Sequence, residues 1–429
     1  MLEKIRKNYL FVCIIVISLV YCIAWYAEFD GDIIYSDGSL YYQYFSRLFV
    51  THDFVGNGLI KYPLGTTLLQ LPFLLVGLVF SKALGIDLEN GLSSVFQGCV
   101  FVAACFYAFL GMFLLYRLLR ERCGQKVAAI TCACMIWGTM FPEYAMLKAS
   151  FSHMYGFFMC TVFVYYIVWY EKTYKDELPL QKRLCMDLLF GAILGINIVI
   201  RNTNVIIGFA YLLYNVFSLK DFTDRVKKIF SVKILPQIAG CALVYLFQIL
   251  SWKIQTGQWI LYSYGGESFA YLTNPKIMEV LFSDVKGLFI YSPVLIISIL
   301  GMITGHKSNK EFALFPCVVF ILQTYIISAW WCWWLGCCYG ERMYCDVLII
   351  FAFPMADFLM RLEDFCYAEC DDIRKAETRK AIYITIYIFI FIFVLFNFMW
   401  IKGCHNSIIS ENMGTWNALH EQFQRFLLK

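Results

Sequence analysis

Residues 28–48 read EFDGDIIYSDGSLYYQYFSRL and follow directly on an apolar run at 8–26. That run is close to the ~20 residues that a helix needs to cross a bilayer. Within the stretch, Asp30, Asp32 and Asp37 are followed at once by a tyrosine-rich segment. The chain therefore leaves a predicted membrane helix straight into carboxylates and aromatic side chains, which places candidate chemistry at the membrane surface.

Apolar runs of this kind recur along the whole chain, which is 61% hydrophobic and only 15% charged. A soluble domain averages about 25% charged residues, so the composition argues against a soluble fold. We predict an all-α polytopic membrane protein, a single integral membrane domain over 1–429, with about eleven transmembrane helices. The further runs lie at 94–116, 127–142, 154–170, 185–200, 203–218, 232–251, 311–331 and 381–400.

Basic residues gather on one side of these runs. If the N-terminus is cytoplasmic, the inner segments carry 23 of the 35 Lys and Arg residues. Cytoplasmic loops are enriched in Lys and Arg, so this asymmetry predicts a cytoplasmic N-terminus. The basic start MLEKIRKNY is not followed by a small-residue cleavage site, so we predict that the first helix is retained. The outer side then holds the large loops 27–93 and 252–286 and a short tail, 401–429.

One apolar run, LGTTLLQLPFLLVGLVFS at 64–81, is long enough to span but conflicts with the charge asymmetry. If it crossed, every basic loop downstream would change sides, against the positive-inside rule. We therefore predict a re-entrant or interfacial helix within the outer loop 27–93. A second interfacial helix is predicted over 36–50, where apolar side chains, Tyr41 and Tyr44 among them, recur at helical spacing.

Asp37 has two interpretations that do not exclude each other. It stands where an N-cap of the 36–50 helix is expected, and such a cap leaves its carboxylate exposed at the membrane surface, where it can react. For Asp30 and Asp32 we predict solvated loop acids. Arg201, in IVIRNTNVI, lies at a tight reversal between two apolar runs, where an ionisable residue is a functional hypothesis by default. Its guanidinium suits phosphate; the alternative is an arginine that snorkels to lipid headgroups.

Two further outer segments carry candidate residues. FPEYAMLKASFSH at 141–153 contains Glu143 and His153, although a lone His that begins a helix is more often structural. The sequence YGERM places Arg342 after a tryptophan-rich segment. That segment is either an interfacial aromatic belt with an ion pair or a wall on which a sugar stacks, with a phosphate contact. Phosphate-loop, dinucleotide and zinc-peptidase signatures are absent, so no metal ligand is named and the need for a divalent metal stays open.

The order of these features resembles the GT-C superfamily of membrane glycosyltransferases, which use polyprenyl-phosphate-linked sugars. Asp37, Tyr41 and KYPLGTTLLQLPFLL stand in the order that superfamily shows in its first outer loop. The resemblance to aminoarabinose and protein-mannosyl transferases covers roughly 1–220. Later segments, among them FSHMYGFF, GESFAYL and YGERM, are similar to uncharacterised bacterial membrane proteins usually placed in the same superfamily. The resemblance implies a bacterial inner-membrane enzyme with its active site on the outer face.

The resemblance also implies roles for individual residues. Asp37 would be the general base, and Arg201, with Lys61 and Arg342 behind it, would meet the phosphate of the donor. One departure is that many relatives have an Asp where this chain has His153, so no metal or second-acid role is carried over to that position. The donor would be a polyprenyl-phosphate sugar, the acceptor a glycan, lipid or cell-wall polymer, and no nucleotide is required. The remaining residues expected to line the substrate cavity are Tyr41, Glu143, His153, Tyr264 and Glu267.

A transporter or flippase for a lipid-linked saccharide is the alternative class. Transporters place functional charges near the midplane of broken helices and often show repeated halves. No internal repeat is visible here, and the polar features gather on one face. A catalytically inactive scaffold is a third reading, under which Asp37 would tolerate substitution.

Overall fold

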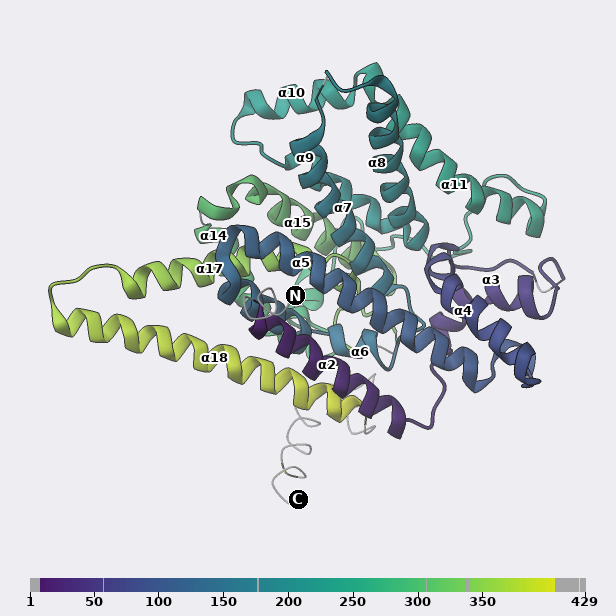
Figure 1. Ribbon diagram of the computed structural model, residues 1–429, viewed down its shortest axis with the longest axis horizontal. Helices are drawn as coiled ribbons and strands as arrows, with labels where there is room; N and C mark the ends of the chain where they lie inside the picture. Colours follow the sequence, from purple (N-terminus) through teal and green to yellow (C-terminus); the bar gives the residue numbers. More distant parts are fainter. Residues whose placement is uncertain are drawn as a thin grey trace. The chain divides into compact units, whose positions relative to one another are not determined.

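The computed structural model describes residues 8–56, 58–175, 177–305, 307–336, 339–405 and Gln424 (Figure 1). Every regular element in this part of the chain is a helix. Among the described residues, seven helices are long and apolar enough to cross a membrane, judged by length and composition. The prediction of an all-α polytopic membrane protein is thereby confirmed. These helices are Tyr9–Glu28, Gly65–Leu84, Glu89–Trp137, Leu180–Ile200, Val232–Thr256, Asn309–Ala329 and Ile373–Gly403.

The chain divides into two compact units. Unit 1 comprises Met1–Ile17, Leu115–Glu143 and Ser268–Lys429, and unit 2 comprises Ser18–Leu114 and Tyr144–Glu267. Helices α2 (Tyr9–Glu28), α5 (Ser94–Trp137) and α6 (Phe141–Ala145) contribute residues to both. The other helices of unit 2 are α3 (Ser36–Phe45), a π-helical turn (Ser46–Val50), α4 (Gly65–Leu84), α7 (His153–Thr173), α8 (Leu180–Ile200), α9 (Phe209–Leu213), α10 (Leu219–Ile229) and α11 (Leu235–Thr256), with short 3₁₀ turns at Glu89–Gly91, Asn202–Gly208 and Val232–Ile234.

Unit 1 contains α12 (Ile277–Phe282), α13 (Leu288–Tyr291), α14 (Leu295–Thr304), a 3₁₀ turn (Lys307–Phe312), α15 (Leu314–Ala329), α16 (Met343–Asp346), α17 (Ile349–Tyr367) and α18 (Ile373–His405). A buried amide ties α18 to the end of α5 in this unit. The side-chain nitrogen of Asn397 donates to the carbonyls of Trp137 and Thr139 at 2.9 and 2.8 Å. Its oxygen accepts from the Tyr339 hydroxyl at 2.9 Å. One polar side chain thus satisfies three groups that have no water to bond to in an apolar core.

Two predicted elements differ in detail from the structure. The runs 94–116 and 127–142 belong largely to one long helical segment, α5, whose backbone departs from helix at Gly124 (φ 74, ψ 172). Glycine reaches that conformation at little cost, so the segment can bend there. The run 203–218 is not a continuous helix, because Asn202–Gly208 is 3₁₀ and only five residues of α9 follow. A 3₁₀ turn rises about 2.0 Å per residue, so this return segment needs fewer residues than an α-helix.

The main packing contact of unit 2 is a glycine-lined approach of α8 to α11. A Cβ on Gly191 would lie 1.7 Å from the Gln237 carbonyl oxygen, and one on Gly240 would lie 2.1 Å from the Leu188 carbonyl oxygen. One turn further on, a Cβ on Gly195 would be 3.0 Å from the Cys241 carbonyl oxygen. Small residues at such spacing let membrane helices bring their backbones together. The two helices therefore pack backbone to backbone.

Polar contacts add to this packing on the other side of α8. The buried Asn197 amide donates to the carbonyl oxygens of Met159 at 3.1 Å and Ile193 at 2.9 Å. Its oxygen accepts from the Cys160 thiol at 3.2 Å. Helix α8 is thus held between α7 and α11, and its last residue, Ile200, leads directly into Arg201.

We expect Gly191→Ala to lower the thermal stability of the purified protein in detergent. The new methyl group overlaps a backbone carbonyl that cannot rotate away, and overpacking of this kind typically costs about 1–3 kcal/mol. Gly208→Ala is the matched control, because a Cβ there has open space and no positive φ. Equal melting of both variants and the parent would show that the close approach of α8 and α11 is not a structural requirement.

Candidate functional site

The predicted helix over 36–50 is present as α3 and the π-helical turn that follows it. The prediction that Asp37 caps this helix is wrong. The N-cap is Tyr35, in extended conformation, and Asp37 lies inside the first turn, where its half-buried carboxylate is favoured by the helix dipole. Ser36, directly before it, has a left-handed φ of 49°, which is strained for a residue with a side chain. Asp30 and Asp32 are exposed, as predicted.

The segment that leads into α3 is anchored to neighbouring elements of unit 2. The Gln97 side-chain oxygen accepts from the backbone N–H groups of Ile33 and Ile34 at 2.9 and 2.8 Å. The Ser150 hydroxyl donates to the Ile33 carbonyl at 2.6 Å. A Cβ on Gly38 would overlap that same hydroxyl oxygen at 1.8 Å. The start of α3, and with it the Asp37 backbone, is therefore held closely in place.

A buried serine hydroxyl joins two of the predicted site residues. The Tyr41 hydroxyl and an Arg201 terminal nitrogen both donate to the Ser152 hydroxyl oxygen at 3.2 Å. Ser152 precedes α7 in the N-cap position, yet its side chain does not cap that helix. Sequence reasoning missed Ser152, because a serine before a helix is ordinarily interpreted as a cap. Here its hydroxyl links α3 to the end of α8.

The KYPLG segment lies beside Arg201 because two buried glutamines and one glycine hold it there. Gln255 and Gln248 on α11 accept from the backbone N–H groups of Ile60 and Leu64 at 2.8 and 2.9 Å. A Cβ on Gly65 would lie 2.4 Å from the Ile200 backbone nitrogen, so only glycine permits this approach of α4 to α8. The start of α4 therefore reaches the backbone directly before Arg201.

Lys61 forms an ion pair with Glu267. Its ammonium nitrogen is 2.5 Å from a Glu267 carboxylate oxygen, and both side chains are partly exposed. The same ammonium lies 5.4 and 5.5 Å from the ring centroids of Tyr62 and Tyr264. Tyr62 in turn stacks on Tyr41, with ring centroids 4.7 Å apart. Lys61, Glu267, Tyr264 and Tyr41, all predicted site residues, thus form one aromatic and charged cluster.

The electrostatics of Tyr264 connect this cluster to Asp37. Burial raises the pKa of Tyr264 above its ordinary value, and Tyr41 adds to the increase. The nearby Arg201 charge acts in the opposite direction, while Glu267 and Asp37 raise the pKa further. All four groups act on one phenol, so they share a single neighbourhood in unit 2.

An apolar pocket of about 330 Å³ opens beside this neighbourhood. It is bounded by Asn202, which follows Arg201, by Tyr245 and Trp252 of α11, and by Tyr262 and Tyr264 of the loop after α11. A pocket of this size and lining can hold the apolar part of a ligand while a charged end lies at its mouth.

His153 and Lys148 occupy the buried interior of unit 2. The His153 side chain is fully buried at the start of α7, with its ring edge-on to Tyr144 at a centroid distance of 4.6 Å. Lys148 is 2% exposed, and its ammonium lies 5.6 Å from the Phe151 ring centroid. The sequence analysis assigned no role to Lys148, which lies in the segment 141–153, because no sequence pattern indicates that a lysine side chain will be buried.

Two predicted site residues, Glu143 and Arg342, belong to unit 1. Glu143 is 2% exposed and Arg342 is half-buried. Unit 1 also contains a fully buried Glu341 near Arg342 and Lys286. Burial raises the pKa of Glu341 well above its ordinary value despite those two cations, which favours the neutral acid. Within the described residues, no group of three or more His, Cys, Asp or Glu side chains is placed to hold a metal ion.

Comparison with known proteins finds similar folds but no similar sequences. No family model matches the chain, and no curated protein sequence matches it. The similar solved structures include two of an oligosaccharyltransferase from Archaeoglobus fulgidus. The archaeal oligosaccharyltransferase AglB, in complex with an inhibitory peptide and a dolichol-phosphate, has a TM-score of 0.53 and 11% identity, and the match covers 91% of this chain and 55% of that one. The apo form has a TM-score of 0.54 and 12% identity, covering 92% and 56%.

The predicted resemblance to GT-C membrane glycosyltransferases is confirmed at the level of the fold. The chain spans a little over half the length of the proteins that it matches. At this identity the likeness concerns the fold alone. The class defined so far is thus a polytopic membrane protein whose fold is similar to that of an archaeal oligosaccharyltransferase.

The Ser152 hydroxyl, which accepts from both Tyr41 and Arg201, leads to a prediction about stability. Ser152→Ala deprives the buried Tyr41 hydroxyl of this acceptor, and an unsatisfied buried donor costs about 1–3 kcal/mol. We expect a lower melting temperature in detergent for this variant. The double variant Tyr41→Phe/Ser152→Ala removes donor and acceptor together and should cost less than the two single changes combined. Strictly additive effects would contradict the contact.

Proposed function

We propose that the protein transfers a sugar from a polyprenyl-phosphate-linked donor to a cell-envelope acceptor on the outer face of the membrane. The observation that carries this proposal is the shared neighbourhood of Asp37, Tyr41, Arg201 and Glu267 around Tyr264. It combines a carboxylate and a guanidinium near Tyr264, which also lines an apolar pocket. A similar fold is found in an archaeal oligosaccharyltransferase whose structure contains a dolichol-phosphate, which supports a lipid-linked donor.

Asp37 would act as the general base. The acceptor hydroxyl must lose a proton as its oxygen attacks the anomeric carbon, and a positioned carboxylate can accept that proton. The bond from the anomeric carbon to the phosphate oxygen breaks in the same step, through an oxocarbenium-like transition state as in glycoside hydrolysis. The carboxylate lies in the first turn of α3, where the helix dipole favours negative charge.

Arg201 would meet the departing phosphate. Negative charge grows on the leaving group, and a fixed cation stabilises it most where water is excluded. The bond to Ser152 holds one arm of the guanidinium in place before the donor binds. Lys61 is the second candidate for this contact, and its pair with Glu267 would have to loosen for it to turn to phosphate. For Arg342 and Glu143, which belong to unit 1, the roles stay predictions from the sequence, as does the cavity role of His153.

The pocket beside Tyr264 would take the isoprenoid end of the donor. Its lining is mainly aromatic and aliphatic, with Ile249, Trp252 and Ile260 among its residues. Burying an apolar chain there is favourable at roughly 25 cal/mol per Å² of apolar surface. The charged phosphate would then lie at the Asn202 end, next to Arg201. The energy for transfer is contained in the donor itself, so no nucleotide is needed.

The proposal also includes the number of membrane crossings and the orientation of the chain in the membrane. With about eleven crossings and α4 re-entrant, Asp37 and Arg201 both face the outside of a bacterial inner membrane, and the N-terminus lies in the cytoplasm. Helix α4 is long and apolar enough to cross, so only the charge asymmetry argues for this arrangement. The need for a divalent metal stays open.

A transporter of lipid-linked saccharides is the alternative, and detergent solution separates the two. A detergent micelle does not separate two compartments, so a transporter cannot move its substrate across it, and a transporter leaves that substrate chemically unchanged. A transferase consumes the donor in a micelle. The substrate for this assay is the lipid-linked glycan that accumulates in a deletion strain, identified by mass spectrometry.

We expect Asp37→Asn to reduce sugar transfer by about 10²–10⁴-fold, because the change removes the proton acceptor while keeping the shape of the side chain. The purified variant should melt like the parent and still bind polyprenyl phosphate. The measurement is donor consumption in detergent, together with clearance of the accumulated glycan in the deletion strain.

Asp30→Asn and Asp32→Asn are the matched controls, since both acids are exposed. Neither should change transfer. Normal transfer by Asp37→Asn together with loss in one of the controls would move the base to that acid. Normal transfer by all three variants would contradict the proposed general-base mechanism.

Arg201→Lys tests the phosphate contact. Lysine keeps the charge but lacks the planar fork of donors, so we expect weaker donor binding, and Arg201→Ala should be weaker still. Binding is measured with polyprenyl phosphate and the purified, folded variants. Equal affinity in the parent and both variants would assign Arg201 to lipid headgroups instead.

A further inference from the structure

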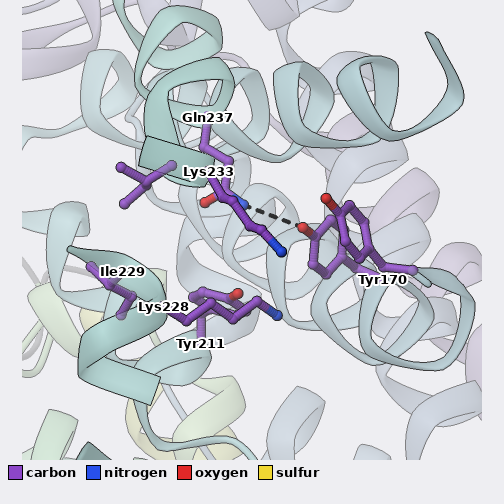
Figure 2. Close-up of a pocket in the computed structure, with 8 residues that line it drawn as sticks. Tyr170, Tyr211, Lys228, Ile229, Lys233 and Gln237 are labelled. Atoms are coloured by element: carbon purple, nitrogen blue, oxygen red, sulfur yellow. Dashed lines mark hydrogen bonds between the residues drawn. The ribbon is translucent and has the colours of Figure 1, made fainter. Parts of the chain in front are cut away.

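A second pocket lies at the other end of α8, in the same unit as the Asp37 site. It has a volume of about 290 Å³, and Tyr170, Tyr174, Tyr211, Lys228, Lys233 and Gln237 line it (Figure 2). Gln237 donates to Asp187 at 3.0 Å and to the Tyr170 hydroxyl at 3.4 Å. Asp187 and Arg201 are about 21 Å apart along α8, at ~1.5 Å per residue. The pocket is therefore separate from the site of the proposed transfer.

Lys228 reaches into this pocket over aromatic faces. Its ammonium nitrogen lies 5.8, 5.8 and 5.7 Å from the ring centroids of Tyr170, Tyr174 and Tyr211. Figure 2 shows the Lys233 side chain reaching toward the same space beside Tyr170. Two ammonium groups thus face one cavity lined by tyrosine rings, and ammonium groups are suited to binding a phosphate group.

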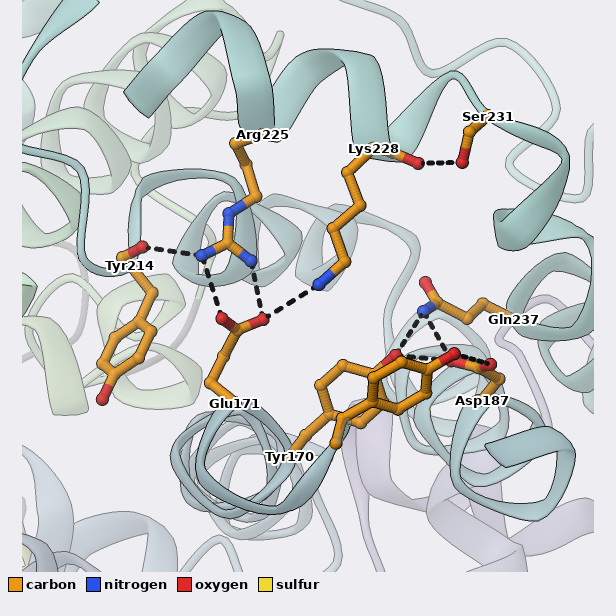
Figure 3. Close-up of polar contacts among 9 residues, drawn as sticks. Tyr170, Glu171, Asp187, Tyr214, Arg225, Lys228, Ser231 and Gln237 are labelled. Carbon is orange, nitrogen blue, oxygen red and sulfur yellow. Dashed lines mark hydrogen bonds and ion pairs between the residues drawn. The ribbon is translucent and has the colours of Figure 1, made fainter. Parts of the chain in front are cut away.

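The nearest carboxylate already has a closer partner. Arg225 binds the two oxygens of Glu171 at 2.7 and 3.2 Å, whereas Lys228 is 3.5 Å from one of them (Figure 3). Asp187 is bonded to Tyr170 at 2.6 Å and to Gln237. The charged residues that line the pocket are Lys228 and Lys233, so its lining is positively charged.

The charge of Lys228 is maintained by its surroundings. Burial by itself disfavours the ammonium, but the interactions with Tyr211 and Glu171 outweigh burial and raise the pKa of Lys228 above its ordinary value. The side chain therefore stays cationic at any physiological pH.

Helix α10 places the pocket at a membrane surface. None of its residues is buried, and apolar side chains on and just after it are exposed, Leu219 by 85% and Phe230 by 86%. An amphipathic helix with basic residues and exposed large apolar side chains lies in the membrane interface. Val232, in the turn that leads to α11, is 79% exposed as well. A ligand of the pocket would accordingly come from the lipid layer.

We propose that this pocket binds the phosphate headgroup of an anionic membrane lipid. Lys228 and Lys233 would contact the phosphate, and the acyl chains would lie along the exposed apolar side chains of α10. By the charge asymmetry this is the cytoplasmic side, opposite to Asp37. The proposal does not depend on sugar transfer.

The experiment is a lipid titration of the purified full-length protein in a zwitterionic detergent, followed by native mass spectrometry. The probes are phosphatidic acid and diacylglycerol with the same acyl chains. We expect the parent to bind phosphatidic acid in preference to diacylglycerol. Lys228→Gln and Lys233→Gln should each weaken binding of phosphatidic acid about tenfold, because each removes a charge-assisted contact to phosphate.

Lys227→Gln is the matched control. It lies on the same helix, its side chain is 78% exposed, and it pairs with Asp224 outside the pocket. It should bind like the parent. The Glu171–Arg225 pair is untouched in all three variants, so α10 stays docked, and unchanged melting temperatures verify this.

Three results would overturn the proposal. They are equal binding of phosphatidic acid and diacylglycerol, equal weakening by Lys227→Gln and Lys228→Gln, and parent-like binding by both pocket variants. Inorganic phosphate alone forms the fourth arm. If it displaces phosphatidic acid at equal concentration, the pocket is a site for a soluble anion and the lipid assignment is wrong.

Discussion

The arrangement of unit 2 depends on the contact between the backbones of α8 and α11. Gly191 and Gly240 have no side chain, so a backbone carbonyl oxygen of the facing helix lies close to where each Cβ atom would be. In a bilayer the solvent does not drive helices together, and close backbone packing with interhelical hydrogen bonds provides the attraction. Because α8 is held this closely, Asp187 within the helix and Arg201, directly after its last residue, have defined positions.

From that contact the candidate site follows in two steps. Gln248 and Gln255 on α11 bind the backbone before α4, and Gly65 lets α4 reach the end of α8. The Ser152 hydroxyl then joins α3 to Arg201. The polar groups of the site are thus carried by buried hydrogen bonds, which hold their geometry better than exposed ones.

Much of the site could be predicted from the sequence because its members lie in short motifs. Asp37 and Tyr41 are one helical turn apart, and Arg201 stands out as a charge between apolar runs. Other features could not be predicted. Ser152 resembles an ordinary cap, and the N-cap role assigned to Asp37 failed because the N-cap is Tyr35, two residues earlier, and the helix begins at Ser36. Ser36 also has a left-handed φ of 49°, a backbone conformation that no sequence pattern indicates.

The sequence by itself determined the class of the protein, since long apolar runs can be satisfied only as membrane helices and Lys and Arg sort to one side of a bilayer. Both properties depend on the order of residues along the chain and not on contacts between distant segments. The tertiary structure alone decided which groups meet. Lys61 and Glu267 form an ion pair across 206 positions of sequence, and Glu171 finds Arg225 across 54. Such pairings depend on how helices pack, which is set by backbone clearance at a few glycines and by buried amides, not by spacing within any one segment.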